Sequence, residues 1–467
     1  MNARPYHRVA ASVALAALLG ACAGPVANRA FDEVGAITEQ RIGQRAVWIK
    51  SETDEQNIRE TLDGLLAKPL SADGAVKIAL INNRRLQADF SELGIGAADL
   101  TSSWRPGNPG FSFARLKRGE ELAIDRSVTM DALQLLLLPF TAGIENRRFE
   151  ATKLRTAGEI MALAAQAKKA WYEAVAAEQT AAYIAQVRDA AETQAEIARR
   201  MKQVGNFNTL DYAREQIFYA TATARLAKSR VTATVARERL GRLMGLWGND
   251  MQFKLPERLP DLPKTPREGE NIESQAIAGR LDVQMAKADM DALSRAYGLT
   301  NATRFINVLD VGYQKNSESG KRDQRGYEIG FEIPIFDFGD AKATRAEQAY
   351  LQAVHRLADT AVNARSSARE AYIGYRSSYD VARHYEANII PLRQRMSEEM
   401  VLRYNGMLVS VFELLADARE QIADVIAAVE AQRDFWLADT DLTYVTIAPL
   451  EGPSVLERIA AQSGRAE

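Results

Sequence analysis

The chain has 467 residues, a formal net charge of −2 and one cysteine. Its length allows about two or three ordinary domains, but it is rich in Ala, Glu, Arg, Leu and Gln and poor in Pro and aromatic residues, which is typical of long helices. The near-neutral charge gives no electrostatic case for nucleic-acid binding, and a single cysteine excludes an internal disulfide.

Residues 1–21 have the layout of a signal peptide, with a basic start and a short apolar core. They end in L-G-A, directly before Cys22, and this tetrapeptide resembles the lipobox of bacterial lipoproteins. The resemblance implies that Cys22 becomes the mature N-terminus and carries acyl chains. Ala23 after it implies sorting to the outer membrane. The alternative is a plain secretory signal with a chance cysteine.

Residues 22–74 are mixed and charged, and we expect a short helix and an extended connector there. Helical spacing from Ala75 to about Leu100 predicts a helix, which the Pro- and Gly-rich stretch 104–110 ends. Two strands are expected next, at Phe111–Lys117 and Leu122–Leu138.

Pro139 and Gly143 then lead into a helix expected from about Ile144 to Val204, which is on the order of 90 Å long. Gly205 turns the chain back into a second helix, Thr209–Met244. A helix of this length cannot be the interior of a compact domain. It must belong to a coiled coil, a solenoid or a spanning strut.

After the proline-rich linker 256–270, the same order of elements is predicted again. A helix at Ile272–Tyr297 precedes a strand at Arg304–Gln314 and a polar turn. The next strand, Tyr327–Ile335, alternates strictly between apolar and polar residues, which indicates one apolar and one wet face. Taken alone, this strand favours an ordinary half-buried sheet over a porin-like wall.

This strand cannot run far past Pro334, which has no N–H for a ladder. Asp337 and Gly339 follow, and then a second very long helix, about Ala341–Tyr404, in which Pro391 is a candidate kink. Gly406 turns the chain back into a last helix. The predicted order is signal peptide 1–21, lipidated segment and connector 22–74, first repeat 75–255, linker 256–270, second repeat 271–445 and a polar tail 446–467.

Each repeat holds two strands, and a two-stranded pair is not stable alone. Either the four strands of one chain form a small capping sheet, or several chains pool their strands. Four strands are too few to close a barrel with an aqueous lumen, whereas three chains would supply about twelve, a closable number.

The stretch P-I-F-D-F-G at Pro334–Gly339, followed by a helix with regularly spaced alanines, resembles the strand-to-helix junction of the TolC family of outer-membrane efflux proteins. Pro139 and Gly143 stand in the corresponding place in the first half. The internal duplication, the lipobox, the total length and the turns at Gly205 and Gly406 also fit. The resemblance covers roughly residues 75–445.

The resemblance implies an α+β membrane protein that is a homotrimer. Long antiparallel helices would form a coiled-coil barrel in the periplasm, and three chains would pool four strands each into a transmembrane β-barrel in the outer membrane. Such a protein is the passive exit duct of a tripartite efflux or type I secretion system. Its implied partners are a periplasmic adaptor, an inner-membrane pump and outer-membrane lipid.

The family often places an Asp six residues after each turn glycine to close the periplasmic tip. Asp211 matches this pattern in the first half. In the second half the position is Phe412, with Glu413 beside it, and Leu415 stands where a further Asp is common. The closed tip is therefore expected to involve apolar constriction by Phe412 and Leu415, or else these two residues are seam positions of the coiled coil.

Candidate catalytic or metal-ligating residues are lacking. His355 and His384 are 29 positions apart on one long helix, too far for one local metal site. The sequence shows neither a phosphate-binding glycine loop nor a nucleophile elbow. We expect no enzyme activity, no metal and no cofactor. The alternative function is a lipid-anchored periplasmic coiled-coil scaffold without a pore, which would have no need for four two-faced strands. The substrate stays open between drugs, metal ions, solvents and peptides.

Overall fold

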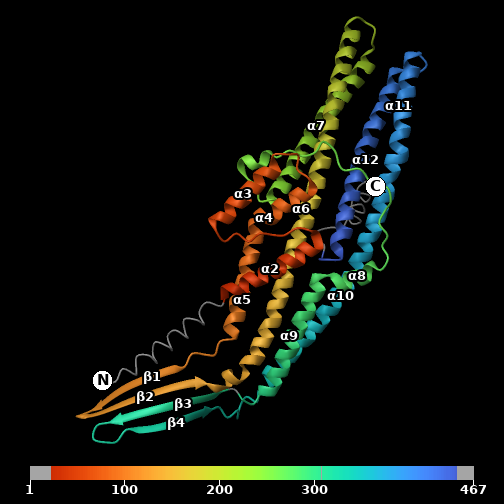
Figure 1. Cartoon of the computed structure of the whole chain (residues 1–467). Helices are drawn as coiled ribbons and strands as arrows, with labels where there is room; N and C mark the ends of the chain where they lie inside the picture. Colours follow the sequence, from red (N-terminus) through yellow and green to blue (C-terminus); the bar gives the residue numbers. More distant parts are fainter. Residues whose placement is uncertain (1–22, 307, 450–467) are drawn as a thin grey trace. The chain divides into compact units, whose positions relative to one another are not determined.

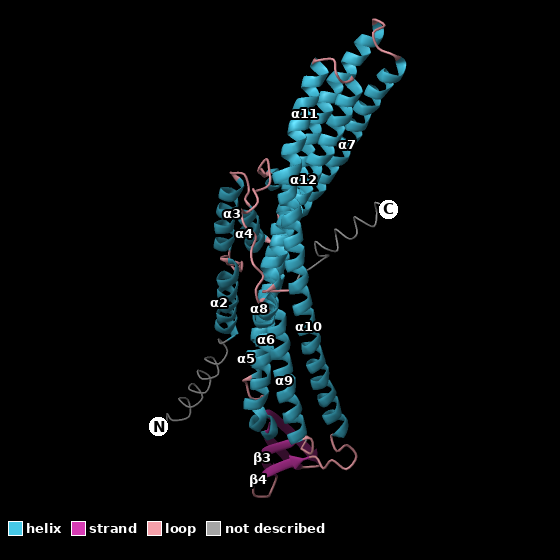
Figure 2. Ribbon diagram, turned by 90° about the vertical axis from the view of Figure 1, so that its right-hand side faces the viewer, coloured by secondary structure: helices cyan, strands magenta, loops and turns pink. Residues whose placement is uncertain are grey.

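The computed structural model describes residues 23–306 and 308–449 (Figure 1). The signal peptide, Cys22 and most of the predicted tail lie outside these residues. Most of the described chain is helical, and it contains one small sheet (Figure 2). The chain forms two compact units. Of the described residues, the first unit comprises 23–37, 88–157, 281–306 and 308–362, and the second comprises 38–87, 158–280 and 363–449.

Two helices occupy the N-terminal region, where we expected one short helix and an extended connector. Helix α2 spans Ala23–Ile42 and α3 spans Glu52–Leu66, so the connector is confined to residues 44–50. A capping box starts α3, because Ser51 Oγ accepts from the Asp54 N–H at 3.2 Å while the Asp54 carboxylate accepts from the Ser51 N–H at 3.0 Å.

The helix expected from Ala75 is broken into α4 (Ala72–Asn82) and α5 (Arg84–Ser103). Asn83 lies between them in an extended conformation, with ψ of 120°. Its side-chain oxygen accepts from the Arg85 and Leu86 N–H groups at 2.9 and 3.2 Å. An asparagine side chain that bonds the following backbone competes with helical hydrogen bonds, which explains the break.

The four strands form one antiparallel sheet in the order β1-β2-β3-β4 (Figure 1). The expected second strand was too long, because β2 ends at Asp131 and not at Leu138. The expected third strand was shifted, and the fourth ends before Ile335. The observed strands are β1 Gly110–Arg118, β2 Glu121–Asp131, β3 Leu309–Glu318 and β4 Gln324–Phe331.

Helix α6 begins directly after β2 and spans Ala132–Gln203, a length of 72 residues. The Asp131 carboxylate accepts from the Gln134 N–H at 2.8 Å and so caps the helix at this point. Pro139 and Gly143 therefore lie inside α6, and the expectation that they form a strand-to-helix junction was wrong. The Thr141 hydroxyl donates to the Leu138 carbonyl at 3.0 Å beside the proline.

Helix α7 (Thr209–Leu243) runs back along the part of α6 that lies in the second unit. Gln216 Nε2 donates to the Ala195 carbonyl at 3.2 Å, and Arg239 forms an ion pair with Glu173 at 2.7 Å. We call α6 and α7 the first helical hairpin. A short 3₁₀ helix, Gly248–Gln252, follows it.

The second half begins with α8 (Ile272–Gly279) and α9 (Leu281–Thr303), where one helix was expected. Arg280 separates them with an extended backbone, at ψ of 132°. The strands β3 and β4 follow α9. The remaining helices are α10 Asp340–His384, α11 Ile390–Asn405 and α12 Val411–Val445.

The kink expected at Pro391 takes the form of a five-residue π-helix, Tyr385–Ile389, between α10 and α11. The Ile390 N–H donates to the Tyr385 carbonyl five residues earlier. Pro391 has no N–H to continue the α-helical pattern, which accounts for the wider turn before it. Helices α11 and α12 form the second helical hairpin.

An aromatic core holds the second unit together. Trp171 Nε1 donates to the Leu70 carbonyl at 2.8 Å, and Tyr172 stacks on Trp436 with 5.3 Å between ring centroids. Phe435 is fully buried among further aromatic rings. Away from this cluster α6 buries mostly alanines, which let helices approach closely. They are Ala157, Ala164, Ala167, Ala191, Ala195 and Ala198.

Candidate functional site

The sheet has an apolar face and a polar face. Alternation along the strands and their register place Phe111, Val128, Tyr313 and Tyr327 in one cross-strand row. The Tyr313 and Tyr327 rings are in contact, with centroids 5.8 Å apart. The next row toward the helices holds Met130, Val311 and Ile329. We call the side of the sheet that carries these rows the apolar face.

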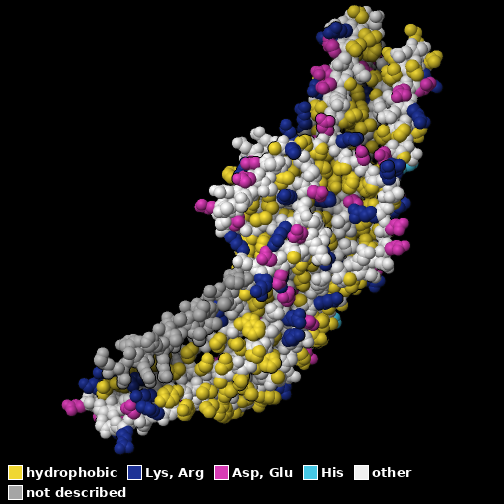
Figure 3. Space-filling view, viewed as in Figure 1, with side chains coloured by type: hydrophobic (Ala, Val, Ile, Leu, Met, Phe, Trp, Pro, Cys, Tyr) yellow, Lys and Arg dark blue, Asp and Glu magenta, His cyan; other side chains and the backbone are white. Residues whose placement is uncertain are grey.

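The apolar face is exposed to solvent in the single chain. Tyr327 is 87% exposed and Phe111 is 68% exposed. The loop after β4 adds Phe336 and Phe338, which are also exposed. Figure 3 shows hydrophobic side chains gathered in this part of the molecule. Because an apolar surface of this kind is rare on a monomeric soluble protein, we expect lipid or protein to cover it.

The opposite side of the sheet, which we call the polar face, carries hydroxyls, amides and carboxylates. The Ser112 and Ser127 hydroxyls bond to each other at 2.9 Å, and Gln314 donates to the Glu328 carboxylate. Asp131 and Asp310 are direct cross-strand partners. A sheet with one wet and one apolar face can separate water from hydrocarbon.

The turn between β4 and α10 is closely packed. Asp337 Oδ1 accepts from the Gly339 N–H at 2.8 Å. Gly339 has φ of +73°, and a Cβ there would lie 2.5 Å from the Arg304 carbonyl oxygen. Only glycine fits this position, so the geometry explains the glycine of the P-I-F-D-F-G stretch.

The first helical hairpin reverses at a left-handed glycine, whereas the second reverses at a left-handed methionine. Gly205 has φ of +78°, and the Asn206 N–H donates to the Met201 carbonyl at 2.9 Å. In the second hairpin the residue with positive φ is Met407, at 58°, and not Gly406. The Gly406 turn therefore differs from the Gly205 turn by one position.

Asp211 and Glu413 lie in the first turns of α7 and α12. Asp211 accepts a contact from Asn208, whose side chain caps α7, and lies 3.5 Å from Arg214. Glu413 accepts from the Ser410 N–H at 2.7 Å in a capping box. Both carboxylates complement the positive end of a helix dipole.

Leu415 is buried, with 5% of its surface exposed, so its side chain packs within the single chain. The side chain of Phe412 lies outside the described part of the structure. The role of Leu415 and Phe412 in a constriction stays a prediction.

Sequence reasoning missed Glu215, on the inner side of α7. It is 4% exposed, and within the described chain neither carboxylate oxygen has a hydrogen-bond partner. Burial raises its pKa, the Arg419 charge on α12 opposes this rise, and Asp211 adds to it. Arg419 also lies over the Phe218 ring, 4.8 Å from its centroid. Glu215 therefore lies where the two helical hairpins of the second unit meet.

Arg393 was also missed. On α11 it contacts three carboxylates of α12: it pairs with Asp424, with Glu420 at 2.8 Å and with Asp417 at 3.7 Å. Acidic residues at this helical spacing on α12 were the available signal, because residues three, four and seven apart share one helix face. This ion-pair group ties the first turn of α11 to α12, at the end of α11 away from the turn that joins the two helices.

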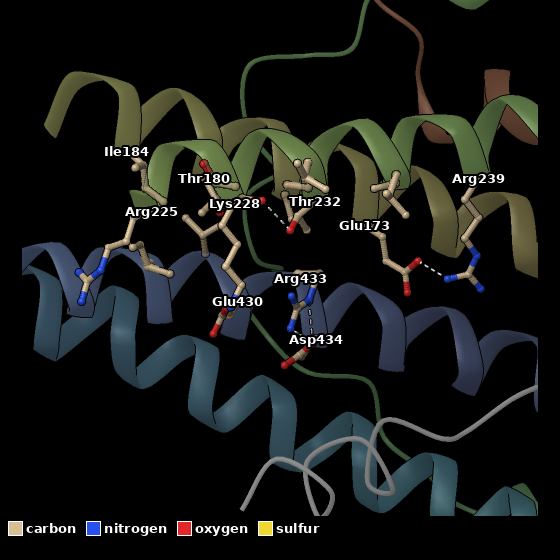
Figure 4. Close-up of a pocket in the computed structure, with 18 residues that line it drawn as sticks. Glu173, Thr180, Ile184, Arg225, Lys228, Thr232, Arg239, Glu430, Arg433 and Asp434 are labelled. Carbon is tan, nitrogen blue, oxygen red and sulfur yellow. Dashed lines mark hydrogen bonds and ion pairs between the residues drawn. The ribbon is translucent and has the colours of Figure 1, made fainter. Parts of the chain in front are cut away.

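A groove of about 740 Å³ runs between α6, α7 and α12 in the second unit (Figure 4). Its α7 wall presents Val231 and Val235, which are 63% and 62% exposed. Charged side chains surround this apolar stretch. Those labelled in Figure 4 are Glu173, Arg225, Lys228, Arg239, Glu430, Arg433 and Asp434.

Within residues 23–306 and 308–449, no group of His, Cys, Asp and Glu side chains is arranged to hold a metal ion. Among the described helices, none is long and apolar enough to cross a membrane.

Residues 272–397 match a family model described as outer membrane efflux protein. No curated protein matches the chain in sequence. Several solved structures are similar in fold. The outer membrane channel CmeC of Campylobacter jejuni is 15% identical, with a TM-score of 0.70 over 90% of this chain and 93% of that one.

The outer membrane protein VceC of Vibrio cholerae is 12% identical, with a TM-score of 0.64 over 84% of this chain and 96% of that one. The open state of the MtrE outer membrane channel of Neisseria gonorrhoeae is 16% identical, with a TM-score of 0.63 over 80% of this chain and 88% of that one. At these identities the similarity concerns the fold: a mostly helical chain with a small sheet, as in these outer membrane proteins.

Proposed function

We infer that this chain, whose residues 272–397 match the model of the outer membrane efflux protein family, is the exit duct of a tripartite efflux or type I secretion system. The duct conducts substrates passively from an inner-membrane pump across the periplasm and the outer membrane. The observation that carries the proposal is the four-stranded sheet, which has one exposed apolar face and one polar face and leads directly into α6.

Three chains pool their strands into one closed barrel. The strands have 8 to 11 residues, close to the roughly 9–11 that span a membrane at a tilt. In the described chain, β1 and β4 each pair on one side only. Open edges of this kind need a partner, and closure in a homotrimer removes them. The apolar face then meets lipid and the polar face lines the lumen.

An internal duplication supports the same assembly. The order helix, strand, strand, long helix, returning helix occurs from α5 to α7 and again from α9 to α12. We assign the repeats to residues 75–255 and 271–445, joined by the linker 256–270, with a tail at 446–467. Residues 1–21 are a signal peptide, and acylation of Cys22 anchors the chain in the outer membrane.

A helical periplasmic adaptor docks in the groove between α6, α7 and α12. The exposed Val231 and Val235 offer the adaptor helix an apolar contact. The surrounding charges of both signs fix the position at which the adaptor helix docks. The periplasmic tip, at Gly205 and Gly406, is the gate. Its opening is a shift of the second helical hairpin against the first, with Asp211, Phe412, Glu413 and Leu415 close to the constriction.

Native mass spectrometry of the detergent-extracted, lipidated protein and single-channel recording in planar bilayers test this proposal. We expect a mass near three times that of the mature acylated chain, and discrete pores. A Cys22→Ser variant should lose the acyl mass. A stable monomer or dimer without conductance would overturn the duct and leave the lipid-anchored scaffold.

A further inference from the structure

Charged residues are sorted between the two faces of the sheet. Among the charged strand residues whose side chains the structure describes, the polar face holds carboxylates and the apolar face holds cations, as alternation and register indicate. The polar-face carboxylates are Glu121, Asp125, Asp131, Asp310, Glu318 and Glu328. The apolar-face cations are Arg115, Lys117, Arg126, Lys315 and Arg325.

Three of the cations stand side by side. Arg126 is the cross-strand partner of Lys315, and Lys315 is the partner of Arg325. We call these three residues the cationic row. Adjacent strands are about 5 Å apart, and like charges directly opposite each other are destabilising. Lys315 is paired with Asp323 at 3.1 Å, and within the described residues no ion pair forms with Arg126 or Arg325. The row therefore has more positive charge than the chain neutralises.

The cationic row lies at a defined height on the sheet. It is next to the row of Phe111, Val128, Tyr313 and Tyr327, on the side toward the strand turns. Arg115 and Lys117 lie still closer to the turn between β1 and β2. Cations on a lipid-facing surface are costly at the centre of a bilayer and tolerated near its edge, where their long side chains reach the headgroups.

We propose that the cationic row binds the phosphate groups of an anionic lipid at the outer edge of the membrane. The proposal rests on the proposed function, which directs the apolar face to lipid and the strand turns away from the periplasm. Arginine binds phosphate through paired, charge-assisted hydrogen bonds, and the apolar row beside the cations contacts the acyl chains of the same lipid. The occupant is a lipid with exposed phosphates and not a free anion, because the acyl chains supply the second contact.

Lipid binding to the full lipidated protein in detergent can be measured by native mass spectrometry. The probes are a bisphosphorylated diglucosamine lipid (lipid A) and the same lipid without phosphates. We expect about tenfold more phosphorylated than dephosphorylated lipid on the trimer. The combined change Arg126→Gln, Lys315→Gln and Arg325→Gln should abolish this preference. The matched control, with the same loss of charge away from the sheet, is Arg230→Gln, Arg242→Gln and Lys264→Gln.

Arg126→Lys with Arg325→Lys should keep most of the preference, because the charge is retained. If the triple variant does not assemble, the single Arg325→Gln variant on the edge strand should still weaken the preference. If the wild-type trimer assembles and conducts but does not prefer the phosphorylated lipid, this inference alone is overturned. The same holds if the triple variant keeps the preference for the phosphorylated lipid. Displacement of the lipid by excess inorganic phosphate also overturns it. A chain that neither assembles nor conducts overturns both the inference and the proposed function.

Discussion

Gly339 has a left-handed backbone conformation, with φ of +73°. The backbone of Arg304 also blocks the position that a Cβ would occupy. Gly143 is the matched control, because it lies inside α6 and a Cβ there would meet no side chain or neighbouring segment within 4 Å. Gly339→Ala should lower the free energy of unfolding by at least about 2 kcal/mol. Gly143→Ala should raise it by about 1 kcal/mol. Denaturant unfolding followed by circular dichroism compares the two, and equal effects would contradict the proposed difference.

Glu215 makes the stability of the second unit depend on pH. Burial raises the pKa of its carboxyl group in the folded chain above the ordinary carboxyl value. Ionisation is therefore disfavoured in the folded state, and stability falls as pH rises from the ordinary carboxyl pKa through the raised one. Below both pKa values the penalty is absent. Arg419 and Asp211 are the charged groups that act on it.

We expect Glu215→Gln to raise the thermal midpoint at pH 7.5 and to have little effect near pH 4. The measurement is thermal unfolding of the detergent-solubilised protein at both pH values. A variant that shifts the midpoint equally at both would show that packing, and not ionisation, sets the difference.

At the residue scale, sequence reasoning could find groups that act within one turn. It named Asp211 and Glu413 as gate candidates and Gly339 as a junction residue; their hydrogen bonds are with near neighbours in the chain, and the gate role stays a prediction. It could not find Glu215 or Arg393. Their environment comes from other helices, and a single sequence does not state which helix faces which.

Among the elements, the second helical hairpin depends on Arg393. One guanidinium contacts three carboxylates of α12, so its removal leaves Asp417, Glu420 and Asp424 without this cation. Arg393→Gln should loosen α11 from α12 and increase leak conductance of the reconstituted protein several-fold. Arg403→Gln is the control, because its exposed pair with Glu399 lies within α11. A leak conductance equal to the wild-type value in Arg393→Gln would show that this ion-pair group does not help to keep the channel closed.

Changes in the groove between α6, α7 and α12 test adaptor docking independently of conduction. Val231→Glu with Val235→Glu places two carboxylates on its apolar wall. We expect at least a tenfold (~1.4 kcal/mol) weaker binding of the cognate adaptor, measured by biolayer interferometry, with unchanged single-channel conductance. Unchanged adaptor binding would show that docking occurs elsewhere.

Element types could be predicted from periodicity, but their ends could not. Alternation from Tyr327 to Ile335 predicted a strand with the observed faces. The strand stops at Phe331, which pairs with Leu309 at the start of β3, so the end depends on the partner strand. Similarly, Leu135–Leu138 read as strand because the run is apolar, whereas the Asp131 cap starts α6 before it.

For the whole molecule, the polar face predicts the charge of the conducting lumen. Its six carboxylates per chain give the proposed duct a negative interior. Reversal potentials in asymmetric KCl should therefore show a preference for cations. Asp310→Asn should reduce this preference, whereas Glu257→Gln in the linker should not. A preference for anions in the wild-type protein would contradict the assignment of the polar face to the lumen.

The π-helix at Tyr385–Ile389 has a consequence for the phase of the long helix that contains it. One additional residue per turn rotates everything after it by about 100° relative to an uninterrupted α-helix. We expect this offset to turn the side of α11 that carries Arg393 toward α12. We expect the deletion of one residue, such as Ala387, to convert the π-helical turn into regular α-helix. Arg393 would then turn away from the carboxylates of α12. The irregular turn thus sets how far α11 is rotated about the helix axis relative to the end of α10.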